Sequence, residues 1–169
     1  MKAPLIALLA LLASPLLATE AAAHVVAVPD TAKAGSYSAI AFRVGHACAA
    51  GDVTLKVRIE IPEGVASARP QVKPGWTYVL ERGTDPKAAP TAITFEGRLP
   101  DEAFDDFAIL MKLPATGDRL IFPVVQTCEK GESQWTEVAS PDAPDEKLTR
   151  PAPVVTLIPN GAAPAAHQH

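Results

Sequence analysis

The sequence predicts an all-β protein that folds as a two-sheet β-sandwich. Short apolar or alternating segments, about eight or nine of them, are separated by turn signals. Proline (17) and glycine (10) are frequent, whereas aromatic residues make up only 5% of the chain. No stretch shows a sustained helical period with capping residues. The alternative all-β fold is an outer-membrane barrel, which needs an apolar lipid face on almost every strand. The charged side of residues 53–61 argues against it.

The clearest predicted strand covers residues 53–61, where apolar and polar side chains alternate with strict period two. Its expected inward face holds Val53, Leu55, Val57, Ile59 and Ile61. Residues 120–128 form another expected strand, which Pro123 restricts to a sheet edge or a bulge. Residues 139–153 are expected to be a polar, proline-rich crossing segment. The other expected strands are residues 25–28, 36–44, 76–80, 91–95, 107–113, 135–138 and 154–158.

The first 23 residues are predicted to be a secretory signal peptide. Lys2 precedes an apolar run over residues 5–17, and three alanines end the segment at Ala23. The apolar run is about 13 residues long, too short for a transmembrane helix of about 20. We therefore expect a periplasmic or secreted domain over residues 24–158. No second long apolar run follows, so no transmembrane helix is expected in the mature chain. The Ala/Pro-rich tail, residues 159–169, is expected to be disordered.

Charge and motifs exclude several functions. The net charge is −4 and charged residues make up 20% of the chain, whereas nucleic-acid binding needs clustered Lys and Arg. The chain has no G-x-S-x-G or H-E-x-x-H motif and no glycine-rich phosphate loop. A hydrolytic triad would have to use His24 or His46 as its base. The chain is therefore not expected to be an enzyme, and no nucleic acid is expected as a partner.

Cleavage after Ala23 would make His24 the mature N-terminus. The free α-amine and ring Nδ1 of such a histidine can close a chelate on one metal ion. Copper(II) accepts tetragonal nitrogen sites and has the highest affinity among the first-row divalent ions. The alternative is that a histidine follows the cleavage site by chance.

The two cysteines, Cys48 and Cys128, are expected to form a disulfide if the chain is exported. The bridge would close a loop of about 80 residues and contribute roughly 4 kcal/mol in the chain-entropy model. The competing interpretation is a cysteine–histidine copper site that includes His46, two residues before Cys48.

An acidic cluster lies before the strand at residues 107–113. The simplest interpretation is that three of its members are solvated residues at the rim of a loop, namely Asp101, Glu102 and Asp105. Asp106 directly precedes the strand, so its carboxylate could complete a metal shell that begins at His24. Trp135, like Trp76, is first expected in the core, because tryptophan buries a large apolar area.

A series of segments, in this order along the chain, resembles the YcnI-like family of exported bacterial copper-binding domains. These segments are His24-Val25-Val26-Ala27-Val28-Pro29, Gly45-His46-Ala47-Cys48, Ile61-Pro62-Glu63-Gly64-Val65, Lys73-Pro74-Gly75-Trp76, Leu99-Pro100-Asp101, Phe104-Asp105-Asp106-Phe107, Phe122-Pro123-Val124-Val125-Gln126-Thr127-Cys128 and Trp135-Thr136-Glu137. The resemblance covers residues 24–158.

This resemblance implies an immunoglobulin- or fibronectin-like sandwich that binds one copper(II) ion. It implies a mono-histidine brace, in which the α-amine and ring of His24 bind the metal and Trp135 lies nearby. The family's carboxylate ligand is a glutamate, and its position matches Asp106 here. Asp101 and Glu102 are the other candidates. The tail histidines His167 and His169 would act as a loose capture arm or be inert.

The leading hypothesis is a periplasmic copper-binding protein that acts in copper homeostasis, storage or transfer. Its expected partners are the copper ion and a periplasmic or membrane copper-transfer protein, and a monomer or weak dimer is expected. One alternative is an immunoglobulin-like adhesion or assembly module without metal. Another is a copper monooxygenase, which would need a second histidine ligand. His46 is the ordered candidate, but the family pattern places it beside the disulfide cysteine.

Overall fold

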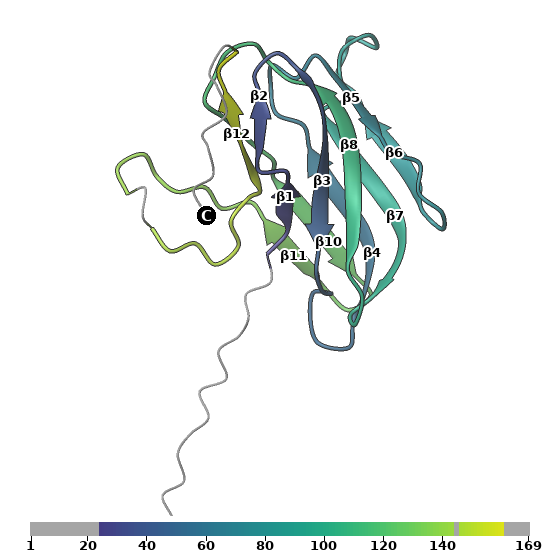
Figure 1. The fold of residues 1–169 in the computed structure, drawn as a ribbon. Helices are drawn as coiled ribbons and strands as arrows, with labels where there is room; N and C mark the ends of the chain where they lie inside the picture. The colour runs from purple at the N-terminus through teal and green to yellow at the C-terminus, as the bar shows by residue number, and fades with distance from the viewer. Residues whose placement is uncertain (1–23, 144–145, 161–169) are drawn as a thin grey trace, which may run out of the picture.

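The computed structural model describes residues 24–143 and 146–160, which form twelve β-strands and no helix. Figure 1 shows two layers of strands that face each other, with a small group of strands at one end. The first layer is a sheet with the order β1-β3-β8-β5. Its strands are β1 (Val26–Val28), β3 (Tyr37–Val44), β8 (Asp105–Lys112) and β5 (Ser67–Pro70). This architecture confirms the predicted all-β sandwich.

The second layer is a five-stranded sheet with the order β11-β10-β4-β7-β6. Its strands are β11 (Glu132–Trp135), β10 (Val124–Cys128), β4 (Val53–Glu60), β7 (Ala92–Pro100) and β6 (Thr77–Glu81). A third, three-stranded sheet holds β2 (Thr31–Lys33), β12 (Val154–Ile158) and β9 (Arg119–Ile121), with β12 in the middle. In this small sheet β2 and β12 run parallel, while β9 and β12 run antiparallel.

The core lies between the two larger sheets and consists of side chains from alternate positions of their strands. Phe42 of β3 packs edge-on against Phe122, with ring centroids 5.0 Å apart, and Phe95 of β7 lies 5.2 Å from Phe107 of β8. Each of these rings removes a large apolar area from water. The largest fully buried side chains also include Ile40, Ile59, Ile93, Ile109, Met111 and Leu113. Burial of this face determines the register of both sheets.

One predicted inward face is partly wrong. Thr54 is completely buried, whereas Leu55 is only half-buried. In the pairing of β4 with β10, Lys56 lies opposite Thr127 and Thr54 opposite Cys128, so Leu55 is an extra residue of β4. Such a bulge adds a residue to one strand and changes the face on which the neighbouring side chains lie. The expected alternation therefore holds from Val57 onward, and the bulge turns the Thr54 hydroxyl inward.

Several other strand boundaries differ from those expected. The single strand predicted over residues 120–128 is divided into β9 and β10, because Pro123 between them has no N–H to donate to a sheet. The carbonyl of Pro123 instead accepts the Glu60 N–H at 2.9 Å. The strand predicted over residues 135–138 is replaced by β11, which ends at Trp135. The strand expected from residue 107 begins at Asp105, so Asp105 and Asp106 lie within β8 rather than before it. The short strands β2 and β5 were not predicted.

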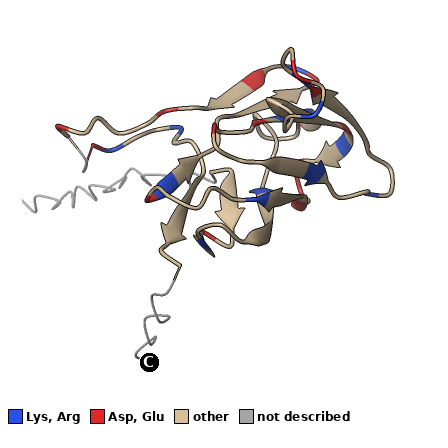
Figure 2. Ribbon diagram, turned by 90° about the horizontal axis from the view of Figure 1, so that it is seen from above, with Lys and Arg blue, Asp and Glu red and all other residues tan. Residues whose placement is uncertain are grey.

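Residues of opposite charge are interspersed along the ribbon (Figure 2). Several form ion pairs between strands of the larger sheets. Lys56 of β4 pairs with Glu96 on the neighbouring β7, and Arg58 of β4 pairs with Glu81 of β6, on the far side of β7, each at 2.7 Å. Exposed pairs of this kind contribute about 0–1 kcal/mol each. They therefore keep the outer faces soluble, while the apolar core provides most of the stability. Within residues 24–143 and 146–160, no helix is long and apolar enough to span a membrane.

Gly97 of β7 is expected to tolerate no side chain. A Cβ atom added there would lie within 2.7 Å of Cε3 of the Trp76 indole, and that indole packs against Phe107 with ring centroids 4.7 Å apart. We expect Gly97→Ala to lower the free energy of unfolding by about 1–3 kcal/mol, because the packed indole must move. Chemical denaturation measures this loss. The control is Gly83→Ala, where an added Cβ meets no atom within 4 Å. Equal stability of the two variants would contradict this packing.

Candidate functional site

His24 lies at the start of β1, at one end of the sandwich. Continuing the antiparallel register of β1 and β3 by two residues places it opposite Gly45. The buried side chains of Val25 and Ala27 fix the start of this strand to the core. The His24 imidazole packs edge-on against Trp135, with ring centroids 5.9 Å apart and an interplanar angle of 79°. The structure therefore brings together His24 and Trp135, two of the predicted site residues.

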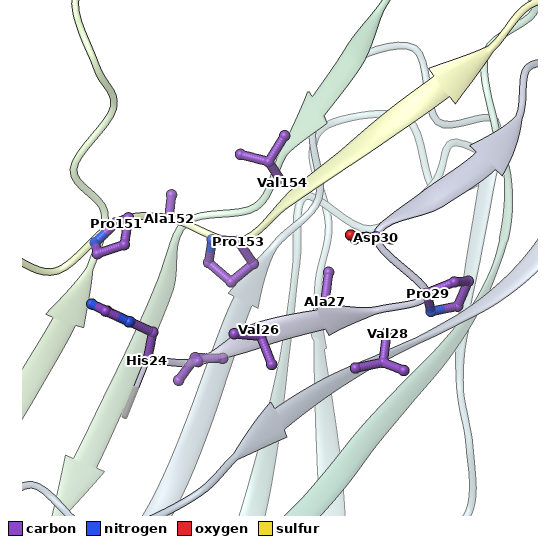
Figure 3. Close-up of a pocket in the computed structure, with 11 residues that line it drawn as sticks. His24, Val26, Ala27, Val28, Pro29, Asp30, Pro151, Ala152, Pro153 and Val154 are labelled. Atoms are coloured by element: carbon purple, nitrogen blue, oxygen red, sulfur yellow. The ribbon is translucent and has the colours of Figure 1, made fainter. Parts of the chain in front are cut away.

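A groove of about 510 Å³ opens beside His24. Its walls are β1 with the following turn and the segment that leads into β12, and its lining is mostly apolar. Figure 3 shows the His24 side chain at one end of this groove, extending toward Pro151. Within the described residues, Nε2 of His24 is the buried side-chain polar atom that has no hydrogen-bond partner. Packing, rather than a hydrogen bond at Nε2, therefore holds this ring.

Trp135 is the last residue of β11 and is 6% exposed. Its indole also contacts a second imidazole, that of His46, with ring centroids 6.3 Å apart and an interplanar angle of 73°. Nδ1 of His46 forms a hydrogen bond with the carbonyl of Ala47. A carbonyl oxygen only accepts, so Nδ1 carries the proton in this bond. Two histidine rings from different segments thus pack against one indole.

A buried amide holds the indole in place. The Trp135 N–H donates to Oε1 of Gln126 at 3.1 Å. Nε2 of Gln126 donates to the carbonyl of His46 at 2.7 Å and to the Thr54 hydroxyl at 2.8 Å. Gln126 and Thr54 are both fully buried. The bulge in β4 is what makes the Thr54 hydroxyl available to this amide.

The Cys48–Cys128 disulfide is present, as predicted, with Cα atoms 6.0 Å apart. It ties the segment between β3 and β4, which carries His46, to the end of β10. The Cys48 N–H also points at Sγ of Cys128, at 3.0 Å. Because both sulfurs are bonded to each other, no thiolate remains for the competing cysteine–histidine copper site.

Asp101 holds the same segment from the other side. Its carboxylate accepts the Gly51 N–H at 2.8 Å and the Ala47 N–H at 3.0 Å. These two hydrogen bonds keep the pKa of the Asp101 carboxyl below its ordinary value, and the bond from Gly51 has the larger effect. The charge of the nearby His46 lowers the pKa in the same direction. Glu102, the other alternative ligand, is exposed in the turn between β7 and β8. Asp101 is thus an anchor of the segment that carries His46.

Asp106 forms a bidentate ion pair with Arg43, the residue opposite it on β3. Nε and Nη2 of Arg43 each donate to one carboxylate oxygen at 2.8 Å. The hydrogen bonds from Arg43 hold the pKa of the Asp106 carboxyl below its ordinary value. Asp106 lies on β8, which β3 separates from β1, and it lines a different hollow of about 140 Å³. In the part of the chain that the structure describes, no group of three or more His, Cys, Asp or Glu side chains is arranged to hold a metal.

Two features of the site were missed from the sequence. The contact of His46 with Trp135 depends on the fold of the disulfide segment, and no sequence pattern indicates it. Gln126 did leave a signal, because period-two alternation in β10 places it on the same inward face as Val124 and Cys128. The predicted signal peptide, residues 1–23, and the tail histidines His167 and His169 lie outside the described residues.

The anchoring role of Asp101 predicts a pH-dependent change in one segment. Because the folded-state pKa is lowered, the stabilisation is complete above the ordinary aspartate value of about 3.9 and is lost as pH falls through the lowered value. In an NMR titration, the amide protons of Ala47 and Gly51 should therefore shift together, with a midpoint below 3.9. Asp101→Asn should abolish both transitions. Separate midpoints for the two amides would contradict a shared carboxylate.

Comparison with known proteins identifies the fold and the family. The structure is similar to the crystal structure of an uncharacterized protein from Nocardia farcinica with an immunoglobulin-like fold, with 28% sequence identity, a TM-score of 0.65, and coverage of 79% of this chain and 97% of that chain. The seventh ScaB type I cohesin from Pseudobacteroides cellulosolvens matches at 11% identity and a TM-score of 0.42, over 82% of this chain and 93% of the cohesin, and this likeness carries no argument. No curated protein matches the chain. The family model described as "Domain of unknown function (DUF1775)" matches residues 24–157, so the chain belongs to the DUF1775 family, the domain of the YcnI-like proteins.

Proposed function

We propose that this protein is an exported copper(II)-binding protein that acts in periplasmic copper homeostasis, storage or transfer. The observation that carries the proposal is the position of His24. It is the first residue of the family domain, its ring packs on Trp135, and an open groove lies beside it. Removal of residues 1–23 would leave the α-amine of His24 free at this place.

The donor chemistry of His24 suits copper(II). The α-amine and Nδ1 close a six-membered chelate ring, and copper(II) favours tetragonal nitrogen ligation. A neutral imidazole that binds metal through Nδ1 keeps its proton on Nε2. Within the described residues, Nε2 makes no hydrogen bond that metal binding would have to break. The contact with Trp135 restricts the rotation of the ring, so less conformational freedom is lost when the metal binds.

The remaining ligands are proposed to be Asp106 and water. Asp106 lies on β8, two strands from β1, so its side chain would have to leave Arg43 and move across β3 toward His24. Both side chains of the pair are partly exposed, at 43% for Arg43 and 36% for Asp106. Such a pair contributes only about 0–1 kcal/mol, so its loss is a small cost. The groove would give access to the copper-transfer protein that donates or receives the ion.

The chelate predicts that copper binding depends on a free amine at His24. Protein that begins at His24 should bind one copper(II) per chain and give a tetragonal paramagnetic resonance spectrum, because no thiolate is present. One extra residue before His24 replaces the amine by an amide and should weaken binding at least about tenfold. Isothermal titration measures both affinities.

Deletion of the tail, residues 159–169, is the control for this experiment. It removes His167 and His169 and should leave the affinity unchanged. Loss of tight binding on this deletion, together with no effect of the extra N-terminal residue, would show that the tail is the ligand and would contradict the proposal.

The proposed carboxylate ligand can be tested with a matched pair of variants. Asp106→Asn should weaken copper binding severalfold, while Asp105→Asn, which alters the neighbouring carboxylate bound to Lys73, should not. Arg43→Met frees the Asp106 carboxylate and should strengthen binding. If Asp106→Asn has no effect in the copper titration, water fills this position and Asp106 is only the partner of Arg43.

A further inference from the structure

Gln126 is a fully buried amide that connects separate parts of the site. Its side chain bonds Trp135 of β11, Thr54 of β4 and the backbone of His46. From these contacts, and on the basis of the function proposed above, we infer that Gln126 is a positioning residue for the copper site. It holds the indole of Trp135 at the angle that orients the ring of His24.

The chemistry of its partners fixes the orientation of this amide. An indole N–H can only donate, so Oε1 must face Trp135. The carbonyl of His46 can only accept, so Nε2 must face that carbonyl. The second hydrogen of the amide goes to the Thr54 hydroxyl at 2.8 Å. Both donors and one acceptor position are used, and no rotation of the amide satisfies the same three partners.

The same residue also connects the indole to the disulfide segment. The backbone oxygen of Gln126 lies 3.4 Å from Sγ of Cys48. Its side chain donates a hydrogen bond to the carbonyl of His46, and the ring of His46 packs against the indole of Trp135. The position of Trp135 is therefore set jointly by its own strand and by the segment between β3 and β4, and Gln126 is the side chain that joins them.

The consequence for metal binding follows from the His24–Trp135 contact. The indole supports the imidazole edge-on and leaves Nε2 buried. This orientation reserves Nδ1, the ring nitrogen nearer the backbone, for a chelate with the α-amine. If the indole turns, the imidazole loses the surface that restricts its rotation. Groups that orient a metal ligand in this way commonly change metal affinity when they are altered.

The test compares two glutamines on adjacent strands. Gln126→Met keeps the length of the side chain and removes all three hydrogen bonds. Gln134→Met is the matched control, because Gln134 is exposed on β11 and its side chain bonds only Glu132 among the described residues. Both are made in a Trp76→Phe background, so that fluorescence reports Trp135. Copper affinity, the paramagnetic resonance spectrum and the indole N–H signal in NMR are measured for each.

We expect Gln126→Met to weaken copper binding at least about tenfold. It should also broaden the paramagnetic resonance spectrum of the bound copper and shift the NMR signal of the Trp135 indole N–H. The control should change none of these. Unchanged affinity and spectrum in a folded Gln126→Met protein would overturn the inference, because a residue that only stabilises the core leaves both intact. If Gln126→Met does not fold, Thr54→Val replaces it. That variant removes one partner of the amide, and a severalfold loss of affinity is expected, whereas no loss overturns the inference.

If the proposed function is wrong, the positioning role of Gln126 can still be tested without copper. If the wild-type protein binds no copper, positioning is judged from the nuclear Overhauser contacts between the rings of His24 and Trp135. Loss of these contacts in Gln126→Met supports the positioning role, and their persistence overturns it.

Discussion

The edge-on packing of His24 against Trp135 joins the two large sheets at the end where β1 begins. His24 precedes a strand of the four-stranded sheet, while Trp135 ends a strand of the five-stranded sheet. The first residue of the domain is therefore held by tertiary packing rather than left as a free end. The proposed function depends on this contact, because a chelate that includes the α-amine needs the amine and the ring in a fixed relation.

The surroundings of this contact explain why it is rigid. The Cys48–Cys128 disulfide and the Asp101 carboxylate hold the segment that carries His46 from two sides. Gln126 then connects that segment to the Trp135 indole through buried hydrogen bonds. An unsatisfied buried donor costs about 1–3 kcal/mol, so each member of this network restrains the others. The network places a polar, ordered structure beside an apolar groove that leaves one side of His24 accessible.

Sequence periodicity was sufficient to predict the sandwich, because alternation in β3, β4 and β8 follows directly from one buried and one exposed face. It did not predict the bulge beside Thr54, since a register shift depends on how β10 pairs with β4. The resemblance to a known family predicted His24 and Trp135 as site residues, and the structure brings their rings into contact. It could not show that Asp106 faces Arg43, because that pairing arises from the register between β3 and β8. The period-two alternation of β10 places Gln126 on the inward face, but the three hydrogen-bond partners of its side chain come from other segments and cannot be read from this pattern.

The proposed site requires that the amine and the ring of His24 bind copper(II) together. Pulsed paramagnetic resonance of the copper-loaded protein, produced with ¹⁵N-labelled histidine, measures the coupling of the metal to each nitrogen. We expect strong coupling to one amine nitrogen and one imidazole nitrogen. Coupling to imidazole nitrogens alone, with none to an amine, would contradict it.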